Sequence, residues 1–452
     1  MAGRMVVEKI ALKTIQRYHH TTLNSFGEHE TLLEAVSNRP GLFGPNPVSL
    51  LSVMARRRSV RLSDLEEALL NDRSLIRACA FRGSLFLLSS IDYPVYFRAL
   101  YSLVTNSAMD RLLKLGVTES HLNRLALAAQ EIDFQLPQTQ EQLMLDLYPG
   151  KKKIPSLDVQ RLILRKLCDL GILVRTYAKG WKGNEFLYAL IKNWIPEVQL
   201  TTENPESART ETVRRYLRCY GPASAEDVSW WTGLSAAQVQ RSISHLRREA
   251  IRIPVEGFKE ELLALREFIE NMPAQKDKTS EIRFFPPWDP FVFGWQNRKR
   301  MVDKEFQPYV YDLAGNATGV IVDDGKAIGI WQFRDSQINV FEFHVFHPYV
   351  ARRKEVFHLA EVHATSIANL SGAESVHIFE RPLLAPLAER EPGSFLWPLG
   401  KDLPFASRDE RLFESPVERR TSNTFRHKYL DSENVIPVSD VASFGVRQRA
   451  IG

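Results

Sequence analysis

Residues 220–246 read YGPASAEDVSWWTGLSAAQVQRSISHL, and they carry the clearest signal of fold in the chain. Ser224 and Ser235 each stand three residues before an acidic or amide side chain, which is the capping box that opens a helix. Gly233 separates the two short helices. Two helices joined by a glycine turn predict a helix-turn-helix, whose second helix enters a DNA major groove. An ordinary helical hairpin is the alternative that this segment leaves open.

The second helix of this pair has an apolar face and a polar face. Apolar residues recur on one side at helical spacing, namely Val239, Ile243 and Leu246. The polar positions are expected to face solvent, namely Gln238, Arg241, Ser242 and His245.

Composition limits the possible classes of protein. At 452 residues the chain is too long for one hydrophobic core, so several packed units are expected. Its net charge of +5 suits a polyanionic partner, although many proteins without such a partner share it. Cys79, Cys168 and Cys219 form no CxxC pair, which fits a reducing cytosol. No signal peptide or membrane-spanning stretch is evident, so we expect a cytoplasmic protein.

The first unit is expected over residues 1–117. Helices at 31–36 and 48–57 flank the irregular stretch RPGLFGPNP, and a capping box at Ser63 opens a third helix. The segment LIRACAFRGSLFLLSS then predicts a hairpin with Arg82 at its tip. Helices followed by a hairpin make a winged helix. Arginines crowd the end of the second helix and predict phosphate contacts, namely Arg56, Arg57 and Arg58.

A second unit is expected over residues 118–200. Its main helix, at about 156–170, is expected to direct three cations outward, namely Arg161, Arg165 and Lys166. The hairpin that follows has a tip suited to phosphate contact and base stacking, formed by Lys179, Trp181 and Lys182. A solubilising turn is the alternative for this tip.

The third unit, residues 201–275, contains the opening motif, a preceding helix at 210–218, a hairpin from Ile251 and a closing helix at 260–271. Beyond it, residues 282–400 change to a β pattern, with two strands around an Asp324-Gly325 turn and a helix at 350–370. Residues 401–452 suggest a loosely ordered tail. The fold class is therefore α+β, with three tandem winged-helix units followed by a compact, β-rich, barrel-like carboxy-terminal domain.

Several classes of chemistry lack their motifs. The chain has no HExxH, Walker loop, GxGxxG or GxSxG motif, so peptidase, NTPase, dinucleotide and α/β-hydrolase functions are unsupported. Histidines between residues 344 and 363 have poor spacing for zinc, namely His344, His347, His358 and His363. We expect neither a metal site nor a cofactor.

Four stretches together resemble a known family. They are VRLSDLEEALLNDRSLIRACAFRGSLFLL, YGPASAEDVSWWTGLS, FFPPWDPFVFGWQNRKR and VIVDDGKAIGIWQF, spread over the chain up to about residue 380. Their order is similar to that of the winged-helix family of bacterial DNA glycosylases that excise alkylated and crosslinked purines, the AlkZ/YcaQ-like family. The resemblance implies three tandem winged helices and a β-domain, arranged as a concave basic surface around duplex DNA.

The catalytic motif of that family is missing. Its Gln-x-Gln or Gln-x-Asp pair would fall within LFGPNP, and no glutamine occurs between Gln16 and Gln130. Phe86 occupies the place of a histidine that the family tends to have after the first wing. Hydrolysis of the N-glycosidic bond needs a polar group that positions water and stabilises positive charge. Asn46 is the one candidate nearby, and a turn role is its alternative.

The leading prediction is a monomeric, nucleoid-associated protein that binds duplex DNA, damaged or distorted, on a glycosylase scaffold without the catalytic pair. Phe43 would act as an apolar wedge at a distorted step. The alternatives are an active glycosylase with a divergent site and a sequence-specific transcription regulator. The predicted DNA-binding residues are Phe43, Asn46, Arg56, Arg57, Arg58, Arg82, Arg161, Arg165, Lys166, Lys179, Trp181, Lys182, Gln238, Arg241 and Ser242.

Overall fold

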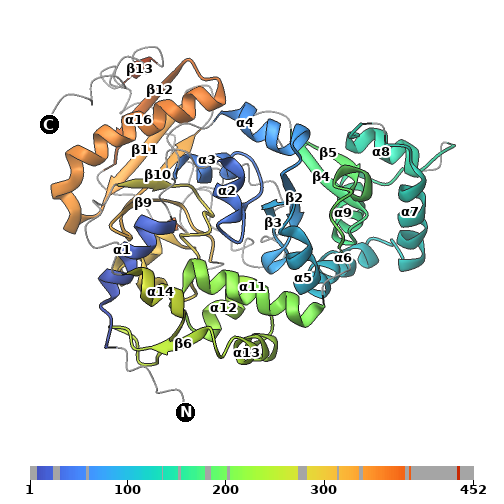
Figure 1. The fold of residues 1–452 in the computed structure, drawn as a ribbon. Coiled ribbons are helices and arrows are strands. Elements are labelled where there is room, and N and C mark those ends of the chain that lie inside the picture. The colour runs from blue at the N-terminus through green and yellow to red at the C-terminus, as the bar shows by residue number, and fades with distance from the viewer. Residues whose placement is uncertain are drawn as a thin grey trace. The chain divides into compact units, whose positions relative to one another are not determined.

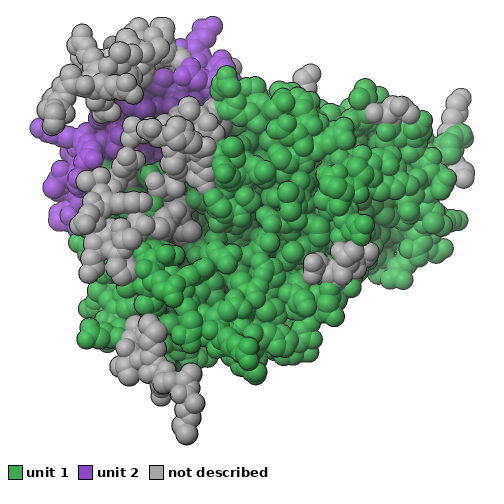
Figure 2. Space-filling model, in the orientation of Figure 1, with its two compact units in different colours: residues 1–283, 288–304, 323–326 green, residues 284–287, 305–322, 327–452 purple. Residues whose placement is uncertain are grey.

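The chain divides into two units, each with its own internal packing (Figure 2). A computed structural model describes residues 8–23, 31–56, 61–134, 136–150, 154–178, 185–200, 204–272, 282–312, 315–334, 339–381, 386–387 and 435–437. Unit 1 comprises residues 1–283, 288–304 and 323–326, and unit 2 comprises 284–287, 305–322 and 327–452. Unit 1 takes in the whole stretch for which three tandem units are expected, and the boundaries between those three remain a prediction.

The amino-terminal part of unit 1 contains the predicted hairpin. Its strands are β2 (Leu75–Cys79) and β3 (Leu85–Ser89), which pair antiparallel. Arg82 lies at the tip with a φ of 53°, so the hairpin prediction is confirmed. The surrounding elements are α1 (Leu12–Leu23), α2 (Leu32–Ser37), β1 (Leu42–Phe43), α3 (Val48–Met54), α4 (Leu62–Glu66) and a π-helical turn, η1 (Glu67–Asn71).

The capping box expected at Ser63 forms earlier, because the Asp64 carboxylate accepts from the Arg61 backbone N–H at 3.0 Å. The helix therefore begins at Leu62.

A five-stranded sheet joins this hairpin to the next one. Its order is β1-β3-β2-β4-β5, with β4 (Leu173–Ala178) and β5 (Phe186–Leu190) forming the second hairpin. Arg77 of β2 lies opposite Arg175 of β4. The two hairpins, which the sequence assigns to separate units, therefore share one sheet.

Helices pack beside this sheet, with α8 and α9 next to β5 and β4 (Figure 1). Their bounds are α5 (Tyr93–Ser107), α6 (Met109–Lys114), α7 (Glu119–Glu131), α8 (Gln140–Leu147), α9 (Leu157–Asp169) and α10 (Ile191–Trp194). The apolar faces of α6 to α9 form one core cluster with β4 and β5, which includes Leu143, Ile163 and Leu167, each of them 0% exposed.

The opening motif folds as two helices, α12 (Ala225–Thr232) and α13 (Ala236–His245), after the long α11 (Pro205–Tyr220). Both predicted capping boxes are present, and Gly233 ends α12 in the left-handed region with a φ of 80°. Strands β6 (Ala250–Ile253) and β7 (Leu262–Leu265) follow as a hairpin. The closing helix is shorter than predicted. Its expected first half is the buried strand β7, and α14 spans only Arg266–Asn271.

Unit 2 contains most of a six-stranded sheet of order β13-β12-β11-β10-β9-β8. The expected turn at Asp324 and Gly325 joins β9 to β10, and both residues have positive φ. Strands β11 and β12 are parallel, and α16 (Arg353–Ser371) connects them. The strands are β8 (Arg283–Phe285), β9 (Gly319–Asp323), β10 (Lys326–Arg334), β11 (Val340–Val345), β12 (Ser375–Glu380) and β13 (Val435–Pro437).

The expected barrel-like closure is not seen among the described strands, since β8 and β13 stand at the two ends of the order. Residues 353–371 confirm the predicted helix, which begins three residues later than expected, after a 3-10 turn over His347–Arg352. The remaining short helical elements are η2 (Phe81–Gly83), η4 (Arg298–Arg300), η5 (Lys304–Phe306) and α15 (Gln307–Val310). Within the described residues, no helix has both the length and the apolar character that crossing a bilayer requires.

Candidate nucleic-acid interface

Three distant segments of unit 1 meet at one tryptophan. Trp230, half-buried on α12, has the guanidinium carbon of Arg82 4.4 Å from its ring centroid. Arg298, from the NRKR run after the FFPPWDPFVFGW segment, places its guanidinium carbon 4.8 Å from the same ring. Both arginines are also partly exposed. We call these three residues the Arg–Trp cluster. The electron-rich face of an indole attracts cations and so helps to concentrate two positive charges here.

The turn between α12 and α13 positions the hairpin tip. A Cβ added to Gly233 would lie 2.7 Å from the Leu103 side chain and 3.2 Å from the Arg82 backbone nitrogen. Arg165 of α9 also holds the tip, because its guanidinium donates a hydrogen bond to the Gly83 carbonyl at 3.0 Å. The location of Arg82 is therefore set by contacts from α9 and from the α12–α13 turn.

The neighbouring Trp231 faces the other way. It is 1% exposed, and its ring centroid lies 4.3 Å from that of Phe81, 5.5 Å from that of Tyr216 and 5.3 Å from that of Tyr220. This aromatic contact joins the hairpin tip to α11 and α12 in the core of unit 1. One tryptophan of the WW pair thus anchors α12, which leaves the adjacent one at the surface.

Helix α13 exposes Arg241, as predicted. Gln238 is half-buried, and its side-chain oxygen accepts from the Ser235 backbone N–H at 2.9 Å, so it serves the cap. Ser242 was expected at the surface, but it is 1% exposed and belongs to the packed face. Helix α13 packs against α11, and helical spacing alone does not tell how wide the covered face of a helix is.

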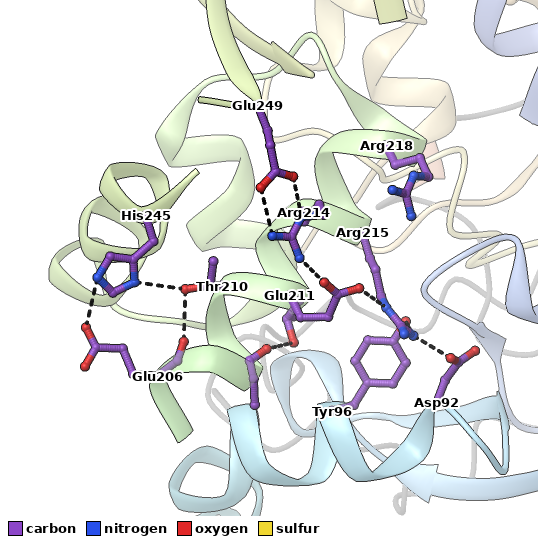
Figure 3. Close-up of polar contacts among 12 residues, drawn as sticks. Asp92, Tyr96, Glu206, Thr210, Glu211, Arg214, Arg215, Arg218, His245 and Glu249 are labelled. Atoms are coloured by element: carbon purple, nitrogen blue, oxygen red, sulfur yellow. Dashed lines mark hydrogen bonds and ion pairs between the residues drawn. The ribbon is translucent and has the colours of Figure 1, made fainter. Parts of the chain in front are cut away.

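Most arginines of α11 are paired with carboxylates (Figure 3). Arg214 contacts Glu249 at 2.7 Å, and Arg215 contacts Asp92, the N-cap residue of α5, at 2.7 Å. Nδ1 of His245, at the end of α13, lies 3.3 Å from the Thr210 hydroxyl of α11. These pairs tie α11 to α5 and to the segment after α13, so α11 has less uncompensated charge than its sequence suggests.

Arg56 is a core residue, contrary to the predicted phosphate contact. It is 4% exposed, and two of its guanidinium nitrogens donate to the Asp289 carboxylate at 2.6 and 2.7 Å. The same guanidinium donates to the Ser52 carbonyl at 2.7 Å. Asp289 is 0% exposed. A bidentate arginine–carboxylate pair in the interior satisfies both charges, and little of the guanidinium remains at the surface.

The three cations of α9 have different environments. Lys166 is 8% exposed and donates to the Thr105 carbonyl, so its predicted outward position is wrong. Burial lowers the pKa of Lys166. Arg165 is half-buried beside Asp169 and holds the hairpin tip as described. Arg161 is exposed, as predicted, and lies 3.7 Å from the Asp158 carboxylate.

Asn46, the candidate catalytic amide, lies in the interior. It is 0% exposed, and its side-chain oxygen accepts from Arg77 at 2.7 Å and from the Ser49 hydroxyl at 3.0 Å. Arg77 is also 0% exposed and donates to the Gly44 carbonyl at 2.8 Å. Burial lowers the pKa of Arg77 to about 10. The amide therefore satisfies a buried guanidinium and presents no surface to a nucleotide.

The apolar wedge predicted at Phe43 is also wrong for this conformation. Phe43 is 1% exposed, pairs with Phe86 across β1 and β3, and stacks on Trp288 with ring centroids 6.0 Å apart. Phe86, which the sequence resemblance predicts to stand in the place of a family histidine, is 3% exposed and packs edge-on against Phe81. Both rings build the core of the hairpin. The remaining candidates lie outside the described residues, namely Arg57, Arg58, Lys179, Trp181 and Lys182.

The described part of the chain contains no group of three or more histidines, cysteines or acids arranged to hold a metal ion. His363 stacks on Phe284 with centroids 4.9 Å apart, and His344 contacts the Arg381 carbonyl at 2.6 Å. Burial lowers the pKa of His363 to about 3.

Sequence reasoning missed Trp230 and Arg298. Two signals were available. Adjacent side chains on a helix point in directions about 100° apart, so one tryptophan of the pair is expected to be less buried than the other. In addition, NRKR is a basic run that follows an apolar segment. What could not be read from the sequence is that these residues meet Arg82.

Comparison with known proteins shows which family shares this architecture. The model of the family described as DNA glycosylase AlkZ-like matches residues 44–366. An interstrand DNA cross-link repair glycosylase of Streptomyces sahachiroi is 24% identical in an alignment of 305 residues that covers 65% of this chain and 81% of that protein. The solved structure of Streptomyces sahachiroi DNA glycosylase AlkZ is similar, with a TM-score of 0.65 and 20% identity over 82% of this chain and 100% of that chain. Because the family model spans more than half of the chain, the resemblance is confirmed and the chain belongs to the AlkZ-like DNA glycosylase family.

Proposed function

We propose that this protein binds duplex DNA, and that it binds damaged or distorted duplexes more tightly than intact ones. The observation that carries the proposal is the Arg–Trp cluster, where two partly exposed guanidinium groups lie over Trp230 beside the first turn of α13. Under this proposal α12 and α13 form a helix-turn-helix, β6 and β7 form its wing, and the chain contains three winged-helix units. The name of the curated relative, a cross-link repair glycosylase, supports a partner of this kind.

Charge and geometry suit phosphate recognition. Arginine presents planar, permanently charged donors that match phosphate oxygens. Arg82 and Arg298 would contact the backbone, and the exposed Arg241 would lie on the helix that enters the groove. Such contacts release counterions, so the logarithm of the association constant falls with the logarithm of salt by about 0.9 for each phosphate neutralised.

Base excision is the second candidate function, and family membership favours it. The buried state of Asn46 counts against its predicted catalytic role, since a group that positions water must reach the reacting sugar. We therefore propose binding as the principal activity. An active enzyme would need another polar group that reaches the reacting sugar.

Binding is tested by fluorescence anisotropy with a labelled duplex that carries one N7-alkylated guanine, and with the same duplex unmodified, over a series of salt concentrations. Arg82→Ala and Arg298→Ala are each expected to weaken binding and to reduce the salt slope by about 0.9. Lys354→Ala removes an exposed cation from α16 in unit 2 and serves as the control. Salt-independent affinity, or equal effects of all three substitutions, would contradict the proposed surface.

Catalysis is tested on the same alkylated duplex by measuring released base. We expect binding without release. Release by the wild-type protein that persists in an Asn46→Ser variant would establish the enzyme and place its catalytic group elsewhere. Release that the Asn46→Ser substitution abolishes, in a variant with unchanged unfolding, would restore the role predicted from sequence.

A further inference from the structure

A shallow pocket of about 320 Å³ opens beside the Arg–Trp cluster. All of its lining residues belong to unit 1 and come from α12, α13 and the segment that leads to Arg298, namely Ala225, Glu226, Ser229, Trp230, Ala236, Gln240 and Gln296. This volume lies at the low end of the range of small-molecule sites, which is about 300–1,000 Å³. It suits a single planar ring system.

A buried carboxylate beneath the pocket supports its wall. The carboxylate of Asp227, a residue that is 2% exposed, accepts from the backbone N–H of Gln296 at 2.8 Å and from that of Asn297 at 3.2 Å. The same residue closes the capping box with Ser224. One buried carboxylate thus fixes both the start of α12 and the segment that carries Gln296 and Arg298, so the pocket and the cluster share one support.

The chemistry of the lining suits a nucleobase. Trp230 supplies an aromatic wall, and two alanines and a serine leave room beside it. Gln240 and Gln296 offer amides that donate and accept, whereas the Glu226 carboxylate offers only acceptors. A phosphate would be repelled by Glu226, which makes a free anion a poor occupant of the pocket itself.

We propose that this pocket receives one unpaired guanine base of the bound DNA. Guanine presents two adjacent N–H donors on its pairing edge, and a carboxylate can accept from both. The glutamine amides would donate to its O6 oxygen. Arg82 and Arg298, both on Trp230, would hold the phosphates that flank the displaced nucleotide. This inference rests on the proposed DNA binding and names the feature of distorted DNA that is recognised.

The test compares three labelled duplexes of one sequence, which are fully paired, with a single bulged guanine, or with a single bulged cytosine. Wild-type protein is expected to bind the bulged-guanine duplex about tenfold more tightly than the bulged-cytosine duplex, within the discrimination that a good bidentate contact provides. Glu226→Gln should reduce this ratio to about twofold or less without weakening binding to paired DNA.

A matched pair of substitutions tests the pocket itself. Ala236→Phe fills the pocket, whereas Ala237→Phe adds the same ring at the adjacent exposed position of α13, which does not line it. Only Ala236→Phe should abolish the preference for the bulged guanine, and both variants should keep the thermal midpoint of the wild type.

The outcomes separate the two proposals. Salt-dependent binding of paired DNA without any bulge preference would overturn the guanine pocket and the preference for distorted DNA, and would leave only the duplex-binding part of the proposed function intact. Equal binding of bulged guanine and cytosine, even if Ala236→Phe blocks both, would overturn the assignment of guanine. Failure to bind any of the three duplexes would overturn both proposals.

Discussion

Replacing Asp289 by alanine is expected to destabilise unit 1 severely, because it leaves a guanidinium charge in the core. The side chains of Arg56 and Asp289 are 1% and 0% exposed, and two hydrogen bonds of 2.6 and 2.7 Å join them. Asp289 also accepts from the Phe291 backbone N–H at 2.9 Å. Removing one partner of a buried ion pair costs about 3–5 kcal/mol, most of it from the charge that stays behind without compensation.

The same reasoning predicts that the effects of substitutions at Arg56 and Asp289 on the free energy of unfolding are strongly coupled. Arg56→Met alone leaves the Asp289 carboxylate buried without its partner and should lower the free energy of unfolding by a similar amount. The double variant, Arg56→Met with Asp289→Leu, leaves no buried charge without a partner. Its loss of unfolding free energy should therefore be well below the sum of the losses of the two single variants. Urea unfolding followed by tryptophan fluorescence gives the four free energies of unfolding, and unchanged slopes against urea would show that the comparison is like for like.

Two results would refute this reasoning. A loss below about 1 kcal/mol for Asp289→Ala would mean that the pair lies in effectively high dielectric, as a surface pair does. An Arg56→Met variant with wild-type stability but weakened DNA binding would mean that Arg56 contacts phosphate, as its position at the end of the second predicted helix suggested. Lys354→Ala, a change at an exposed site, controls for nonspecific effects.

Three further changes test how the chain supports its interface. Gly233→Ala puts a Cβ in a left-handed turn, 3.2 Å from the Arg82 backbone nitrogen, and should cost about 1–3 kcal/mol and weaken duplex binding. Gly116→Ala has a similar φ of +81° and nothing within 4 Å, so it should cost stability but spare DNA affinity; equal affinities of the two variants would exclude the coupling. His19 has its pKa lowered from 6.5 to about 3, by burial first and a nearby arginine charge second. Between pH 6.5 and 3 the His19 imidazole is therefore protonated in the unfolded chain and neutral in the folded chain. The free energy of unfolding should fall by about 1.4 kcal/mol per pH unit as the pH drops from 6.5 towards 3. His19→Gln should flatten the acid side of a plot of unfolding free energy against pH, and an unchanged plot would contradict the buried neutral ring. Lys166→Met should retain duplex affinity, because the ammonium group is inside the protein, and a loss of affinity in anisotropy titrations would return it to the DNA surface.

Local elements of this fold were readable because their signals are local. The capping boxes at Ser224 and Ser235 and the hairpin tip at Arg82 each involve residues within three or four positions of one another. The Asp324-Gly325 turn needs only two adjacent residues that tolerate positive φ. Such features form in the same way whatever the rest of the chain does, so the sequence alone determined them, and the order of motifs was enough to identify the family.

Only the tertiary structure decided whether individual polar side chains lie in the core or at the surface. Arg56 meets Asp289 across 233 positions of sequence, and Asn46 meets Arg77 across 31. Helical spacing separates the faces of a helix, but it does not say which partner covers a face. For this reason Lys166 and Ser242, polar by type, were expected in solvent and lie inside. The Arg–Trp cluster depends on the same physics, because its three members come from segments that only the folded core, with Trp231 packed among Phe81 and Tyr216, brings together.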